Sequence, residues 1–221
     1  MQTTYLAYNR MGRRGLRGDG DPNLVIGAPT RAGLRYTDTS NGLRYLSRNV
    51  LDLNNSSFIT LPTLSNVQKV EFKFFTSQTT ISTFQPYFEW SLGDADRINL
   101  ERRGDTSNLS FVNSTAVLNG SSISNNATNP TANLWNRIAL TSVGGVPKKL
   151  DLIGRGTNAN STRRSQVRIA DFRALGAADV LLASYSINEG SGTTIIDSVS
   201  GQNGTLTLGS GSWQLDWVPL N

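Results

Sequence analysis

The sequence predicts an all-β fold, an antiparallel two-sheet jelly-roll sandwich with an extended N-terminal arm. Short segments in which apolar and polar residues alternate recur along the chain, and turn-forming Gly, Asn and Ser separate them. Segments with the 3.6-residue apolar period of a helix are nearly missing from the sequence. With 221 residues, the chain is long enough for one large sandwich that has its own core. We therefore expect an arm over residues 1–48 and a sandwich over residues 49–221.

The N-terminal part carries all of the excess charge. Residues 1–48 contain eight Arg and three Asp, a net of +5, whereas the remaining residues contain 13 basic and 13 acidic side chains. The stretch GRRGLRGDGDP in this part has no apolar periodicity, which predicts an arm that becomes ordered only on a partner. Arginine pairs bidentately with carboxylates and phosphates, so we expect the arm to dock on neighbouring subunits. The docking residues that we predict are Arg10, Arg13, Arg14, Arg17, Arg31 and Arg35.

Two alternatives to subunit docking concern the same arm. In the first alternative, the arm has no partner and is a solvated tail. Nucleic acid is not the partner that we expect, because the arm lacks interleaved aromatic residues and a folded basic groove.

A β-hairpin is predicted where the arm meets the sandwich. Residues 34–46 read GLRYT, DTSN and GLRYL, so two short alternating stretches flank a turn rich in Asp, Asn and Gly. Leu34 and Tyr36 are expected on one face of the first stretch, and Leu43 and Tyr45 on one face of the second.

The remaining strands follow at short spacing. In 69–76, Val70, Phe72 and Phe74 share one face, which predicts that this face lies in the core. In 135–143 we expect Trp135 in the core, and we expect 119–133 to be a loop across one end of the sandwich. The segments predicted as strands are 57–61, 69–76, 86–92, 97–102, 109–113, 135–143, 149–155, 166–175, 180–187, 204–209 and 213–218.

The composition argues against catalysis. The chain has no Cys and no His, which removes disulfides, thiolate metal sites, the cysteine nucleophile and the usual near-neutral proton carrier. Glycoside hydrolysis needs two carboxylates about 5 to 9.5 Å apart across a cleft. The carboxylates that could form such a pair are Glu89, Asp94, Asp96 and Glu101, and a glycanase is the least favoured alternative. No catalytic residue is predicted.

One segment resembles a known family. Residues 185–213, YSINEGSGTTIIDSVSGQNGTLTLGSGSW, resemble a segment of laminin-G-like, concanavalin A-like lectin/glucanase domains, in which Gly, Asp and Asn fall in the same order. The glycines permit tight turns, and Asp197 and Asn203 can bond their own backbone, a role that we rank above that of calcium ligands. A looser resemblance extends over residues 51–217 and implies the same jelly-roll sandwich.

The resemblance also bears on metal binding. Where such domains often carry a pair of Asp residues that helps to hold calcium, this chain has Asn54 and Asn55, which are weaker neutral ligands. We therefore expect no cofactor, and the departure weakens the case for calcium.

Exposed aromatic platforms with polar companions are the usual signature of carbohydrate recognition. We expect Asn99, Asp94 and Asp96 as the companions, and for each aromatic the alternative is a role in the core or in sheet packing. The candidate glycan-binding aromatics are Tyr87, Trp90, Trp213 and Trp217.

The leading functional expectation is a non-enzymatic virion protein. The resemblance segment lies near the C-terminus, a position that resembles bacteriophage structural proteins carrying this domain, such as capsid-decorating, tail or fibre components. We expect a multi-copy assembly or homo-oligomer, anchored by the arm, with the sandwich facing outward. Neither a secretion signal nor a membrane span is predicted, so we expect synthesis in the host cytoplasm and incorporation into the virion. The alternative is an adhesion module that recognises a host surface glycan.

Overall fold

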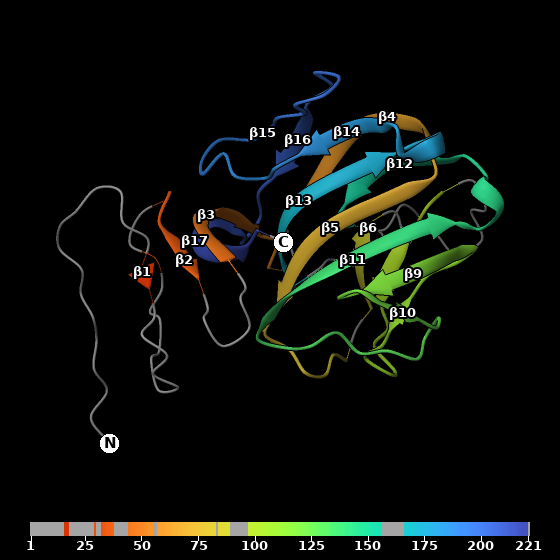
Figure 1. The fold of residues 1–221 in the computed structure, drawn as a ribbon, viewed down its shortest axis with the longest axis horizontal. Helices are drawn as coiled ribbons and strands as arrows, with labels where there is room; N and C mark the ends of the chain where they lie inside the picture. Colours follow the sequence, from red (N-terminus) through yellow and green to blue (C-terminus); the bar gives the residue numbers. More distant parts are fainter. Residues whose placement is uncertain are drawn as a thin grey trace. The chain divides into compact units, whose positions relative to one another are not determined.

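The computed structural model describes residues 16–17, 29, 32–37, 44–54, 57–82, 84–88, 97–155 and 166–220 (Figure 1). The described residues form 17 strands and two single-turn 3-10 segments, Val143–Gly145 and Ala177–Asp179. The predicted all-β class is confirmed. Two compact units are present, one made of Met1–Asn49 with Gln214–Asn221 and the other of Val50–Trp213. The second unit is the sandwich.

One sheet of the sandwich is built around a central antiparallel trio, in which β5 lies between β13 and β11. The free edge of β13 pairs with β14 along one half and with the last residues of β3 along the other half. Figure 1 shows β13, β5, β11 and β9 side by side. The strands of this sheet are β3 (Arg44–Asp52), β5 (Lys69–Thr76), β9 (Ser114–Leu118), β10 (Ser121–Ile123), β11 (Leu134–Ser142), β13 (Arg168–Leu175) and β14 (Leu181–Tyr185).

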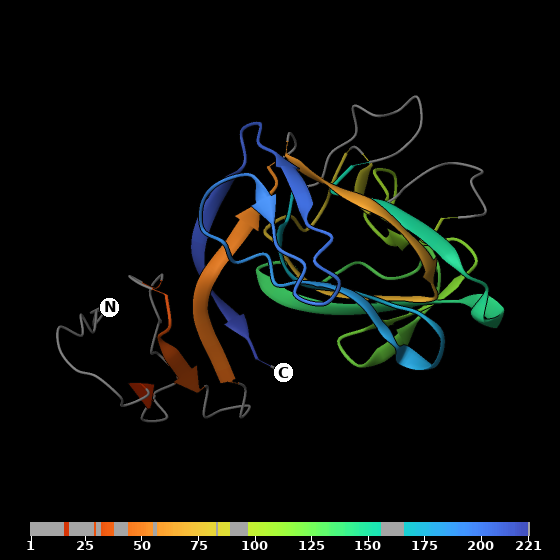
Figure 2. The same cartoon turned by 90° about the horizontal axis from the view of Figure 1, so that it is seen from above.

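The second sheet has the order β15-β16-β4-β12-β6-β7-β8, and all of its pairs are antiparallel. Figure 2 shows the two layers edge-on, with β4 and β12 in one layer and β11 in the other. The strands are β4 (Phe58–Val67), β6 (Gln85–Phe88), β7 (Leu100–Arg102), β8 (Leu109–Ser110), β12 (Lys148–Ile153), β15 (Thr194–Ile195) and β16 (Gly204–Thr207).

The core lies between the two layers, and aromatic side chains from both sheets fill its centre. Phe72 of β5 lies edge-on to Phe88 of β6, with ring centroids 5.7 Å apart, and 5.5 Å from Phe172 of β13. Val70, Phe72 and Phe74 are all buried, as the alternation in β5 predicts. Because burial of one such side chain stabilises the fold by about 1.5–3 kcal/mol, this cluster holds the two sheets together.

The N-terminal unit contains the predicted hairpin. Strand β2 (Arg35–Thr37) pairs antiparallel with the start of β3, and Tyr36 lies opposite Tyr45. Strand β1 (Leu16–Arg17) pairs with β2 in parallel, and β17 (Ser212–Pro219) pairs with β3. Most of the C-terminal strand β17 therefore belongs to the N-terminal unit. The predicted boundary between residues 48 and 49 did not include this association.

Two sequence predictions are wrong in detail. Residues 119–133 are not only a loop, because β9 and β10 form a hairpin around Asn119 and Gly120, both with positive φ. Such values are typical of the two-residue turn that Asn-Gly favours. Trp135 is half-buried on the outer face of its sheet, because Ile138 and Leu140 on the opposite face of β11 point into the core.

Candidate functional site

A row of four side chains crosses the outer face of the first sheet. Arg168 on β13 is in register with Asp52 on β3 and with Phe75 on β5, and Phe75 is in register with Trp135 on β11. Side chains in register on one face lie about 4.5–5.5 Å apart at Cβ. The Arg168 guanidinium stacks over the Phe75 ring at 4.8 Å, and the Phe75 and Trp135 ring centroids are 6.1 Å apart. The row thus combines one carboxylate, one guanidinium and two aromatic rings.

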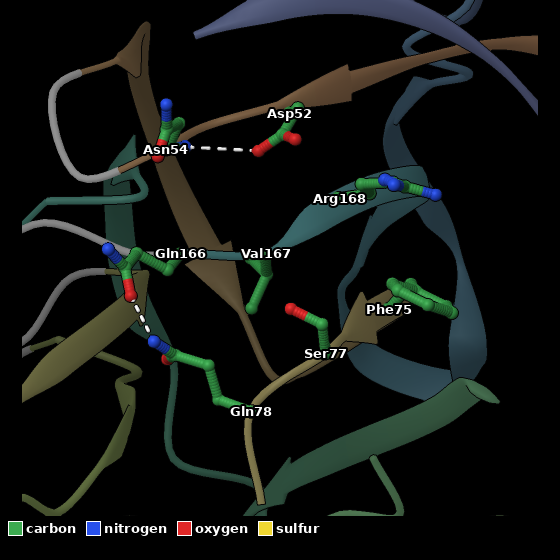
Figure 3. Close-up of a pocket in the computed structure, with 8 residues that line it drawn as sticks. All are labelled: Asp52, Asn54, Phe75, Ser77, Gln78, Gln166, Val167 and Arg168. Atoms are coloured by element: carbon green, nitrogen blue, oxygen red, sulfur yellow. Dashed lines mark hydrogen bonds between the residues drawn. The ribbon is translucent and has the colours of Figure 1, made fainter. Parts of the chain in front are cut away.

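A hollow of about 260 Å³ opens beside this row, where β3 and β5 end and β13 begins. Figure 3 shows the residues that line it, which come from the ends of β3 and β5 and from the start of β13. Its lining is mostly polar, and Phe75 and Val167 supply the apolar surface. The lining residues are Asp52, Asn54, Phe75, Ser77, Gln78, Gln166, Val167 and Arg168.

Three glutamines form a hydrogen-bonded cluster at one side of the hollow. The Gln78 amide nitrogen donates to Gln166 Oε1, and Gln85 Nε2 donates to Gln78 Oε1 at 2.8 Å and to Gln166 Oε1 at 3.5 Å. Gln85 is buried behind the two lining glutamines, and its own Oε1 has no hydrogen-bond partner among the described residues. The cluster therefore fixes how Gln78 and Gln166 present their amides.

The segment that carries Ser77 and Gln78 is held from behind by a buried arginine. The Arg102 guanidinium on β7 donates to the Gln78 carbonyl at 2.9 Å and to the Thr79 carbonyl at 2.8 Å. It also donates to Ser107 O at 2.8 Å and to Asn129 Oδ1 at 2.7 Å. Burial lowers the pKa of Arg102 below its usual value, but these acceptors surround the charge with oxygen.

The opposite side of the hollow is held by the chain before β17. Asn54 has a positive φ of 38°, and its Nδ2 donates to Ser210 O at 3.3 Å while Ser210 Oγ donates to Asn54 O at 3.0 Å. The Asn54 backbone N–H donates to Asp52 Oδ1 at 3.2 Å. These bonds place Asn54 and Asp52 on the same rim.

The aromatic residues predicted to bind glycans are not gathered at this hollow. Tyr87 is fully buried in the core against Phe74, the packing role that the sequence also allowed, and burial raises the pKa of its hydroxyl. Trp213 is half-buried against the core, and its Nε1 donates to Gly192 O at 3.4 Å. Trp217 is half-buried on β17, and Trp90 lies outside the described residues.

The predicted polar companions are also elsewhere. Asn99 is buried, and Asp94 and Asp96 lie outside the described residues. Of the carboxylates considered for glycoside hydrolysis, Glu101 is completely buried and Glu89 is outside the described part.

Most of the docking arm also falls outside the described residues, namely Arg10, Arg13, Arg14 and Arg31. The backbone of Arg17 forms part of β1, and Arg35 is exposed on β2.

Asp197 in the family-like segment is a turn former. Its buried carboxylate accepts hydrogen bonds from the backbone N–H groups of Ser184, Val199 and Ser200 and from the Ser200 hydroxyl. Asn203 Oδ1 accepts from the Asp197 N–H at 2.9 Å. Burial raises the pKa of Asp197, but the four hydrogen bonds outweigh burial and hold it below its ordinary value. The glycine-rich segment thus serves to hold the β14-to-β16 connection.

The described part of the chain contains no cluster of side chains that could hold a metal ion. No group of three or more acidic side chains is assembled there, and Asn55 is not described. Within the same residues, no helix has the length and apolarity needed to cross a bilayer. Comparisons with protein families, curated proteins and solved structures found no match for this chain.

The hollow itself was missed at the level of sequence. Asp52, Phe75 and Arg168 come from three strands that are distant along the chain, and their register is a product of the sheet topology. The local signal in the sequence was alternation within a strand. Phe75 directly follows the buried Phe74, and Arg168 directly precedes the buried Ile169, so both side chains lie on the outer face of the sheet.

Proposed function

We propose that this chain is a non-enzymatic attachment protein whose sandwich binds a carbohydrate in the hollow beside the row of Asp52, Arg168 and Phe75. The observation that carries the proposal is the composition of the hollow, in which amides, a hydroxyl, a carboxylate and a guanidinium converge next to an aromatic ring. Sugars offer many hydroxyls that both donate and accept, together with C–H surfaces that pack on aromatic rings, so this mixture of groups suits them.

Binding without turnover fits the lining better than hydrolysis does. Among the described residues of the hollow, only Asp52 carries a carboxylate. Glycoside hydrolysis by the common mechanisms uses a pair of them. The proposal therefore assigns recognition, and no bond cleavage, to this site.

A glycan array with two matched variants tests the proposal. Arg168→Gln removes the guanidinium at the hollow, whereas Arg137→Gln removes one from the outer face of β11, where Arg137 is exposed and lies 3.8 Å from Glu71. We expect the wild type and Arg137→Gln to bind the same glycans and Arg168→Gln to lose at least about tenfold in affinity. Absence of binding to any glycan, or an equal loss in both variants, would overturn the proposal.

A second part of the proposal concerns attachment to a larger particle. We propose that the basic N-terminal arm docks the protein on other subunits of a virion, with the sandwich displayed outward. The segregation of charge supports this, since residues 1–48 carry the whole net charge of +5. Deletion of residues 1–30 should abolish co-sedimentation with the assembled particle. Unchanged incorporation would contradict docking by the arm, and it would leave the carbohydrate site unaffected.

A further inference from the structure

Four turns at one end of the sandwich lie side by side, because backbone hydrogen bonds join them. The Val143 N–H donates to Asn113 O at 2.9 Å, and the Ser142 N–H donates to Gln68 O at 2.8 Å. The Gln68 N–H donates in turn to Leu175 O at 2.8 Å. Figure 1 and Figure 2 both place the turns that follow β4, β11 and β13 at the same end. The four turns are residues 68, 112–113, 143–147 and 176–180.

These turns expose apolar side chains in place of polar ones. Four valines, between 42% and 59% exposed, define a surface that we call the valine end: Val112, Val143, Val146 and Val180. Ala177 and Ala178, just before Val180, are exposed as well. Asp179 is the one charged residue in the sequence of the four turns, and Lys69 Nζ pairs with its carboxylate at 3.2 Å. The valine end is therefore apolar and carries no unbalanced charge.

The turns do not need these valines for their geometry. Gly144 and Gly145 have positive φ values of 67° and 64° and form the turn between β11 and β12, whereas Val143 and Val146 only flank them. Turns are usually built from Gly, Pro, Asn, Asp and Ser, and residues 119–133, between the opposite ends of β9 and β11, read NGSSISNNATNPTAN. An exposed apolar patch of roughly 300 Å² or more commonly marks an interaction site. The valines thus point to contact with another surface.

We infer that the valine end is the surface through which two copies of this chain associate end to end about a two-fold axis. In such an interface each copy contributes the same patch, so the patch has to be complementary to itself. A neutral apolar surface meets this condition, and it offers a charged partner nothing to pair with. Residues 49–221 contain 13 basic and 13 acidic side chains, so two sandwiches that approach each other are not repelled by net charge.

The size of the surface predicts a weak dimer. Four half-exposed valines supply roughly 300 Å² of apolar area per copy, against about 800 Å² of total area per partner in a standard stable interface. The turns also offer polar groups for the rim that surrounds an apolar interface core, such as those of Gln68 and Asn113. We expect a dissociation constant on the order of 10 µM.

The position of the valine end keeps the proposed carbohydrate site accessible. Strand β5 begins at Lys69, next to Gln68 of the valine end, and it ends at Thr76, next to Ser77 of the hollow. The two surfaces therefore lie at opposite ends of β5, and a dimer joined at the valine end presents two hollows. The inference goes beyond the proposed function and does not depend on it.

Sedimentation velocity of the full-length protein tests the inference. Between about 1 and 200 µM, the wild type should change from monomer to dimer. Val146→Lys places like charges on both sides of the interface and should weaken association at least about tenfold. Ile196→Lys makes the same kind of change at a residue that is 53% exposed outside the four turns, and it should associate as the wild type does.

A mixture of two variants tests the two-fold contact itself. Val146→Glu alone should associate as weakly as Val146→Lys, because each variant repels its own copies. An equimolar mixture of the two should regain the dimer, since opposite charges then face each other. Recovery in the mixture also shows that both variants are folded.

Several results would overturn the inference. They are a wild type that stays monomeric up to about 200 µM, equal association of wild type and Val146→Lys, an equal loss in Ile196→Lys, or no recovery in the mixture of folded variants. Binding of a monomeric wild type to phosphatidylcholine vesicles, lost in Val146→Lys, would assign the valine end to a lipid surface instead. None of these measurements contains a sugar, so they leave the carbohydrate site to its own test.

Discussion

Replacement of Arg102 by Met removes a buried guanidinium that ties three segments together. The side chain is fully buried on β7, and it donates to the 76–79 segment, to Ser107 and to Asn129. Met has a similar length and no hydrogen-bond donor, so the substitution leaves packing largely in place and removes the bonds. The variant therefore measures what the hydrogen bonds contribute.

The expected loss in the free energy of unfolding depends on which of these acceptors can form a hydrogen bond with water once the guanidinium is removed. The bonds to Gln78, Thr79 and Asn129 lie near the surface, whereas Ser107 O and Thr76 Oγ1 are bonded in buried positions. A buried acceptor that loses its partner costs about 1–3 kcal/mol. Relief from burying a charge offsets part of this, as the lowered pKa of Arg102 indicates. We expect the free energy of unfolding to fall by about 3 kcal/mol.

Urea unfolding followed by tryptophan fluorescence measures this loss, and the neighbouring arginine supplies the control. Arg103 is partly exposed and pairs with the exposed Asp105 at 2.6 Å, so Arg103→Met should leave the free energy of unfolding nearly unchanged. A loss below about 1 kcal/mol in Arg102→Met, or the same loss in both variants, would refute the reasoning.

Three further substitutions test other parts of the sandwich by the same unfolding measurement. Asp197→Asn should cost about 2 kcal/mol at pH 7 because two of four hydrogen bonds are lost. The folded-state pKa of Asp197 is depressed, so this difference should be fully present above the ordinary Asp pKa of about 3.9 and shrink as pH falls through the folded value. Tyr87→Phe should leave stability unchanged or raise it by about 1 kcal/mol, since the buried Tyr87 hydroxyl has no hydrogen-bond partner among the described residues. Gly211→Ala should cost about 1–3 kcal/mol, because its Cβ would lie 2.2 Å from Ser57 Oγ and 2.3 Å from Asp52 O.

Two of these substitutions have a control within the chain, and the third is checked by its dependence on pH. Tyr185→Phe removes a hydroxyl that donates to Gln202 O at 3.0 Å, so it should destabilise the fold by about 1 kcal/mol, and a similar loss in Tyr87→Phe would contradict the assignment. Gly201→Ala meets no atom within 4 Å but has a φ of 71°, so only the backbone cost of about 1–2 kcal/mol applies. A pH-independent difference for Asp197→Asn would show that its charge has no part in holding the turn.

The fold class could be predicted because alternation is a local property of the sequence. The β5 segment shows this, since Val70, Phe72 and Phe74 are buried as their spacing predicts. Alternation identifies two faces of a strand but not which one meets the core. The aromatic ring of Trp135 favoured the wrong face of β11, whose buried residues are Ile138 and Leu140.

One missed element did have a local signal. Asn119 and Gly120 form the dipeptide that is most typical of a two-residue hairpin, and short alternating stretches flank it. The polar composition of the whole 119–133 stretch favoured a loop instead. The two-residue strand β15, by contrast, is too short for alternation to identify.

The candidate site could not be predicted because it depends on long-range register. Asp52, Phe75 and Arg168 become neighbours only when β3, β13 and β5 pair, and the sequence does not state these pairings. The prediction of glycan-binding residues relied on residue type, namely aromatic side chains with polar companions. Tyr87 shows its weakness, because a large aromatic side chain is as well suited to the core as to a binding surface.

Mapping of a bound sugar onto the protein tests the central claim most directly. In ¹H–¹⁵N correlation spectra of the labelled protein titrated with a glycan that the array identifies, the backbone amides of Gln78, Gln166 and Arg168 should shift together and saturate with one affinity. Shifts confined to residues remote from the hollow, such as those around Trp213, would contradict the assignment of this site.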